Sequence, residues 1–123
     1  MVGKVNVLWL SKPQEHDYIA AGSFLSLLYE KKFVSGCVKK LELASMREFK
    51  AKDIFRASAL PLLGLANSHV KADKEKIDAK QKISPLLLVR DSKNGKVIIA
   101  DGYHRLCAVY YYDEDAIIPC KII

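Results

Sequence analysis

The stretch Asp101-Gly102-Tyr103-His104-Arg105 has the residue types and spacing of an anion-binding site. It lies between an apolar, β-branched segment at 96–100, which favours a strand, and the apolar residues 106–110, which predict a short buried helix. Asn94-Gly95, just before the strand, predicts a tight turn. Gly102 allows a sharp turn and a close approach of the backbone to a ligand. The free N–H groups of the first helical turn and the positive end of the helix dipole then favour a bound phosphate.

The other side chains of the motif support two interpretations. In the first, Arg105 adds a planar two-pronged donor and His104 adds a donor that titrates near neutral pH, with Tyr103 beside them. In the second, Asp101 is the helix N-cap, and its carboxylate satisfies the same N–H groups and repels phosphate. His104 and Arg105 are then ordinary surface residues. The sequence leaves both interpretations open.

The remaining elements must position this motif. The continuous apolar run Leu86–Val89 predicts a central strand, and Asn67 and Ser68 are capping residues for a charged helix over 69–80. Strands and helices without a regular βαβ alternation predict an α+β fold in a single domain, residues 1–123. The other expected elements are an extended segment or strand at Val5–Leu10, helices at 14–29, 31–43 and 52–59, a strand or connector at 45–49, and strands at 96–100 and 117–123.

Composition limits the class of protein. The chain has 123 residues, of which 50% are hydrophobic, and a formal net charge of +6, which fits an anionic small ligand and does not require nucleic acid. Its three cysteines lack metal-binding spacing and are expected to be buried thiols in a reducing compartment, with Cys107 in the core. No signal-peptide pattern and no apolar run of about 20 residues is present, so we expect a cytoplasmic protein without a membrane partner.

The segment from about Ile54 to Ile123 resembles the ParB/sulfiredoxin superfamily. The resemblance is carried by the ordered series of a charged helix, Ser84–Val89, a hairpin, Asp101–Leu106 and the closing Ile118–Ile122. The equivalent motif is Gly-Glu-Arg-Arg in ParB proteins and Gly-Gly-Cys-His-Arg in sulfiredoxins. The chain also looks like small stand-alone bacterial proteins that carry the label ParB-like nuclease without an assigned activity. The resemblance implies a small mixed sheet with flanking helices over residues 51–123, preceded by a helical extension or lid at 1–50.

By the same resemblance, the ligand is a nucleotide such as ATP, ADP or CTP, and Mg²⁺ is the metal ion expected to accompany it. Gly102, His104 and Arg105 would hold its phosphates. The helix that begins with Asn67, Ser68 and His69 occupies the place from which such proteins direct further polar groups toward the phosphates. His69 and Lys71 are therefore additional candidates.

Differences between this sequence and the family's motifs exclude some of the family's activities. Tyr103 stands where sulfiredoxins have their nucleophilic cysteine, so we expect no sulfiredoxin activity. We expect no chromosome-partition role, because nothing after Ile123 supplies a helix-turn-helix domain. The acidic residues 113–115 begin ten residues beyond Tyr103, about 15 Å along a helix, and cannot share a metal with Asp101 as a nuclease would require.

Three function classes remain open. A phosphotransferase would use Asp101 as a catalytic Mg²⁺ ligand, with His16 or Asp17 folding over the cleft as a base. A non-enzymatic module would bind a nucleotide or a protein partner through residues 1–50. Nucleic-acid binding is the weakest class, because aromatic residues do not alternate with basic ones. The sequence does not decide whether the protein is an enzyme.

Overall fold

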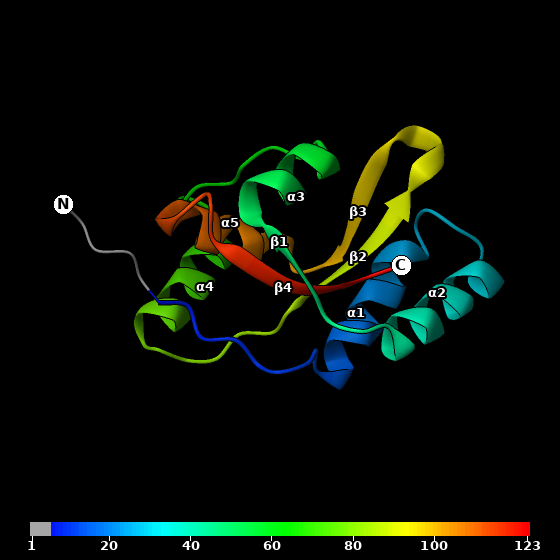
Figure 1. The fold of residues 1–123 in the computed structure, drawn as a ribbon, viewed down its shortest axis with the longest axis horizontal. Coiled ribbons are helices and arrows are strands. Elements are labelled where there is room, and N and C mark those ends of the chain that lie inside the picture. The colour runs from blue at the N-terminus through cyan, green and yellow to red at the C-terminus, as the bar shows by residue number, and fades with distance from the viewer. Residues whose placement is uncertain (1–5) are drawn as a thin grey trace.

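A computed structural model describes residues 6–123 of the chain (Figure 1). Four strands form one sheet, and five α-helices pack around it. The elements in chain order are α1 (Glu15–Leu25), α2 (Lys31–Leu43), β1 (Arg47–Lys50), α3 (Ala51–Ser58), α4 (Ser68–Asp78), β2 (Leu86–Asp91), the 3₁₀ turn η1 (Ser92–Asn94), β3 (Lys96–Asp101), α5 (Tyr103–Tyr112) and β4 (Ile117–Ile122). The predicted α+β class is confirmed.

The sheet has the strand order β1-β4-β2-β3 and is mixed. Strands β2 and β4 run parallel, whereas β1 with β4 and β2 with β3 are antiparallel. Helices α1 and α2 lie on one side of the sheet, and α3, α4 and α5 lie toward the other, as Figure 1 shows. The predicted central position of β2 is confirmed, since β4 and β3 flank it.

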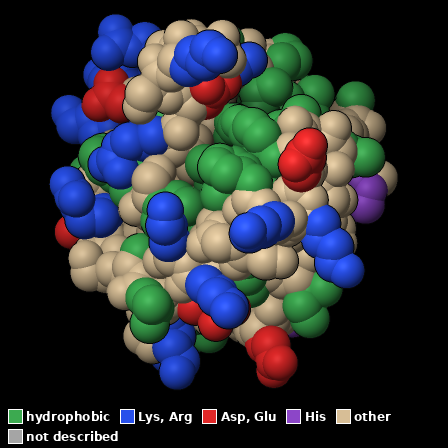
Figure 2. Space-filling view, turned by 90° about the vertical axis from the view of Figure 1, so that its right-hand side faces the viewer, with side chains coloured by type: hydrophobic (Ala, Val, Ile, Leu, Met, Phe, Trp, Pro, Cys, Tyr) green, Lys and Arg blue, Asp and Glu red, His purple; other side chains and the backbone are tan. Residues whose placement is uncertain are grey.

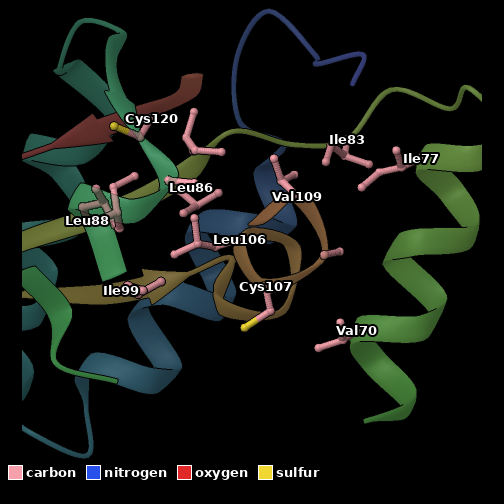
Figure 3. Packing of buried hydrophobic residues seen from close by; sticks show 14 residues of the cluster. Val70, Ile77, Ile83, Leu86, Leu88, Ile99, Leu106, Cys107, Val109 and Cys120 are labelled. Carbon is pink, nitrogen blue, oxygen red and sulfur yellow. The ribbon is translucent and has the colours of Figure 1, made fainter. Parts of the chain in front are cut away.

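Strand β2 is apolar throughout because both of its faces are buried. Leu86 and Leu88 belong to a core cluster with α3, α4 and α5 (Figure 3), while Leu87 and Val89 belong to a second cluster with α1 and α2. Successive side chains of a strand point to opposite faces, so a strand between two helical layers must be apolar at every position. The N-terminal helices are therefore part of the same packed unit as the rest of the fold.

Several local predictions are confirmed in detail. Helix α2 covers 31–43 as predicted, and Asn67 caps α4 through its Oδ1, which accepts from the N–H groups of His69 and Val70 at 3.0 and 3.2 Å. The hairpin between β2 and β3 turns at Gly95, whose φ is +65°. The cysteines are free and buried, with Cys107 in the core as expected.

Two element predictions need correction. Of the two alternatives for Val5–Leu10, an extended segment or a strand, the strand does not form among the described residues, since Trp9 makes only an isolated bridge to Ile83. Val5 lies outside the described part of the chain. The helix expected over 14–29 ends at Leu25, and hydrogen bonds from Leu27 and Leu28 to carbonyls three residues earlier form a turn. Leu27 is exposed, so no packing favours continuing the helix.

An irregularity in the β2–β3 pairing bears directly on the motif. Leu88 pairs with Ile99, but Leu87 pairs with Asp101, which leaves Ala100 as an extra residue in β3. Paired residues share a face of the sheet, so this bulge directs Asp101 to the same face as Leu87, the face on which α1 lies.

No helix in residues 6–123 is both long enough and apolar enough to cross a lipid bilayer.

Replacing Leu88 by alanine should lower the free energy of unfolding by about 2–5 kcal/mol, because it leaves a cavity at the centre of the sheet. The Leu88 side chain is 1% exposed. Leu43 on α2 is 88% exposed, so Leu43→Ala should change the same quantity by about 0.5 kcal/mol or less. Urea denaturation followed by circular dichroism measures both variants, and equal losses would contradict this description of the core.

Candidate functional site

Arg105 in the first turn of α5 connects three parts of the chain. Its Nε donates to the carbonyl of Ser84 at 3.0 Å, and its Nη2 donates to the carbonyl of Pro85 at 3.3 Å and to Asp101 Oδ2 at 2.9 Å. The side chains of Arg105 and Asp101 are only 17% and 15% exposed. The guanidinium therefore fixes the entry of β2, the end of β3 and the start of α5 relative to one another.

The N-cap of α5 is Gly102, in the left-handed region with φ +108°. The carboxylate of Asp101 is directed to Arg105, and in residues 6–123 no side chain accepts from the first N–H groups of α5. The interpretation of Asp101 as a helix cap is therefore wrong, because the salt bridge to Arg105 competes for its carboxylate. The first turn of α5 keeps its N–H groups available.

Helix α1 reaches the motif through Asp17, which is 3% exposed. Asp17 Oδ2 accepts from the Gln14 N–H at 2.7 Å, and its Oδ1 lies 3.3 Å from His16 Nε2. Burial raises the pKa of the Asp101 carboxyl, Arg105 opposes this, and the neighbouring Asp17 raises the pKa further. The two carboxyl groups thus form a buried acidic pair that a single guanidinium balances.

A cavity of about 210 Å³ opens between α4 and the start of α5. The imidazole rings of His69 and His104 both line it and contact each other, with centroids 4.9 Å apart. Lys76 and Asp73 face each other at 3.9 Å on the α4 side. The complete lining is His69, Ala72, Asp73, Lys76, Asp101, Gly102, Tyr103, His104 and Arg105.

The electrostatics of this cavity depend on protonation. Burial lowers the pKa of His104, and the charge of His69 lowers it further, so His104 is largely neutral at pH 7. Burial raises the pKa of Asp73, against the opposing effects of Lys76 and Arg105. Acidification therefore adds positive charge on His104 and finally removes negative charge from Asp73.

The structure gathers some of the predicted site residues and separates others. All five motif residues and His69 line the cavity, although the Tyr103 hydroxyl is directed to the carbonyl of Pro61. The other residues proposed from the start of the charged helix do not line it: Asn67, whose Oδ1 caps α4, and the exposed Ser68 and Lys71.

Sequence reasoning missed Asp73 and Lys76. Both follow His69 at the four- and seven-residue spacings that place side chains on one helical face. Following the helical face of His69 to its next two turns would have identified both residues. Lys71, two residues from His69, lies on another face.

The predicted Mg²⁺ ligand Asp101 has one carboxylate oxygen occupied by Arg105. Among the described residues, no group of three or more histidine, cysteine or acidic side chains is arranged to hold a metal ion. A Mg²⁺ ion bound here would therefore need phosphate oxygens of the ligand to complete its coordination. Mg²⁺ binding stays a prediction.

Comparisons of this chain with protein-family models, with curated proteins and with solved structures return no match. The resemblance to the ParB/sulfiredoxin superfamily stays a prediction that rests on the motif and on the order of the elements around it.

Gly102→Ala should lower the free energy of unfolding by about 1–3 kcal/mol from backbone strain alone. An added Cβ would lie 2.7 Å from Leu86 Cγ and 2.9 Å from Arg105 Nη2, so steric repulsion adds to that loss. Gly36 in α2 has no atom within 4 Å of such a Cβ, and Gly36→Ala should stabilise by about 0.5–1 kcal/mol. Thermal and urea unfolding distinguish the two, and a stabilised Gly102→Ala variant would contradict the geometry of this turn.

Proposed function

We propose that the cavity between α4 and α5 binds a phosphate group of a small ligand, with a nucleotide as the ligand class that best fits. The observation that carries the proposal is the start of α5, whose N–H groups are capped by no side chain of residues 6–123 and open beside the cavity lined by His69, Lys76 and His104. A helix N-terminus beside one lysine and the N–H donors of imidazole rings favours an anion with several oxygens.

The size of the cavity limits what it encloses. Its volume of about 210 Å³ is smaller than the roughly 300–1,000 Å³ of pockets that bury a whole drug-sized ligand. One or two phosphate groups fit within it, while the rest of the ligand, such as a ribose and base, would extend outside. Phosphate binding of this kind requires no metal held by the protein.

Arg105 has a different role from the one its position in the motif suggested. Its Nε and Nη2 are bound to two carbonyls and to Asp101, so these atoms position the turn. In the part of the chain that the structure describes, Nη1 makes no hydrogen bond, and it is the atom left to donate to a ligand. Arg105→Ala would leave the buried Asp101 unpaired, so loss of binding in that variant would not separate recognition from folding.

Lys76 and Lys71 provide a matched test on one helix. Lys76 lines the cavity and Lys71 does not. Isothermal titration of the full chain with inorganic diphosphate, ATP and CTP should show saturable binding that Lys76→Ala weakens by about threefold and Lys71→Ala leaves unchanged. No binding of any of these anions, or an equal loss in both variants, would contradict the proposal and favour a protein-interaction module.

The pH dependence of binding tests the role of His104 separately from that of Lys76. Sulfate keeps its charge across this range, so any change reports on the protein. Its affinity should rise as the pH falls from about 8 to 5.5, because protonated His104 binds the anion and its pKa in the free protein lies below the ordinary value. His104→Ala should flatten this rise, whereas Lys76→Ala should weaken binding at every pH with the same slope. An affinity that stays constant or falls on acidification would show that His104 does not contact the anion.

A further inference from the structure

A second, larger cavity lies between α1 and α2 and shares no lining residue with the cavity at α5. Its volume of about 810 Å³ lies within the range of small-molecule sites. Figure 2, which faces the side of the molecule that bears α2 and the β2–β3 hairpin, shows exposed hydrophobic side chains interspersed with Lys, Arg and acidic residues. Ile19, Gly22, Val34 and Val38 supply apolar wall, and Lys121 comes from β4.

Lys121 is the unusual residue of this groove, because it is only 8% exposed. Its Nζ donates to the carbonyl of Glu42 at 2.8 Å and lies 5.6 Å from the centre of the Tyr18 ring. No carboxylate within residues 6–123 forms an ion pair with it. An ammonium group has three N–H donors, and burying it without an anion is costly.

The contact with Glu42 has a structural role as well. The Glu42 carbonyl belongs to the last turn of α2, where a cation satisfies the free carbonyls and the helix dipole. This contact uses one donor of Lys121. The remaining donors border the groove and are available to a negatively charged ligand group.

The charge of the lining selects the kind of anion. Lys12, Lys39 and Lys121 are balanced in part by Glu15 and Glu42, which leaves a single net positive charge. A monoanion neutralises this charge. A diphosphate or triphosphate would bring several negative charges against the two glutamates, and one net positive charge would not balance them.

We propose that the α1–α2 groove binds a small amphipathic monocarboxylate. The carboxylate accepts hydrogen bonds from Lys121 Nζ, and the aliphatic part of the ligand covers the apolar wall. Ile19, whose side chain is 65% exposed, and Val38 from the facing helix are the principal apolar contacts. The bound carboxylate accepts hydrogen bonds from the buried Lys121 ammonium, and the burial of Ile19 adds hydrophobic stabilisation.

Octanoate and its neutral analogue octanamide test the proposal with the ¹⁵N-labelled full chain. Octanoate should shift the amide resonances of Gly22, Val38 and Lys121 in a saturable manner. Octanamide should bind at least about tenfold more weakly, because it lacks the charge that Lys121 recognises. The assigned spectrum also reports whether shifts are confined to the groove.

Two variants separate recognition from folding. Lys121→Met keeps the apolar stem, loses the ammonium and should reduce octanoate affinity to that of octanamide. Lys121→Met also removes the contact to the end of α2, so a second variant is needed that leaves Lys121 in place. Gly22→Leu fills the groove with an apolar side chain. A Cβ at Gly22 would meet only Val38 Cγ2, at 3.4 Å, so the substitution is sterically tolerable. Gly22→Leu should abolish octanoate binding. Lys40→Met, on the exposed part of α2, is the control and should bind as the unaltered chain does.

Equal affinities for octanoate and octanamide, or shifts scattered over the surface, would overturn the proposal. Concentration-dependent shifts at α1 and α2 without any ligand would also overturn it, because they would identify the groove as a contact between two copies of the chain. These results would leave the diphosphate titrations at α5 unaffected, so the two proposals fail independently.

Discussion

The salt bridge between Arg105 and Asp101 is the interaction on which the motif and the packing around it depend. The guanidinium also binds the carbonyls of Ser84 and Pro85, so one side chain joins the end of β3, the start of α5 and the entry to β2. Ser84 in turn donates its hydroxyl to Gln14 Oε1, at the start of α1. Removing the guanidinium would leave a buried carboxylate without its cation, which is strongly destabilising.

This arrangement gives α1 two roles. One end of the helix carries Asp17 beside the motif, and its Ile19 and Gly22 line the groove toward α2. Ala21 and Leu25 are fully buried against the sheet, so residues 15–25 form part of the core. An anion bound at α5 and a carboxylate bound in the groove would therefore act on the same helix. The two proposed sites differ in their polar side chains, since His104 lines the first and Lys121 lines the second.

Much of the fold could be predicted because its signals are local. The cap at Asn67 and the turn at Gly95 each act over a few residues, and the apolar run 86–89 required burial on both faces of its strand. Prediction was weaker where an element depends on pairing with a distant segment of the chain. The segment around Trp9 is apolar enough for a strand, but its partner Ile83 lies before β2 and in no strand, so only an isolated bridge forms.

The candidate site shows the same division between local and tertiary causes. The sequence by itself determined the sharp turn at Gly102, the helix after it and the buried strand before it, because glycine, β-branched and apolar residues constrain the backbone over short distances. Only the tertiary structure decided that Asp101 binds Arg105 and lies beside Asp17, and that Asp73 and Lys76 face His104 across the cavity. A buried polar side chain binds whichever partner packing brings within reach, and for Arg105 one such partner is a carbonyl 21 residues away.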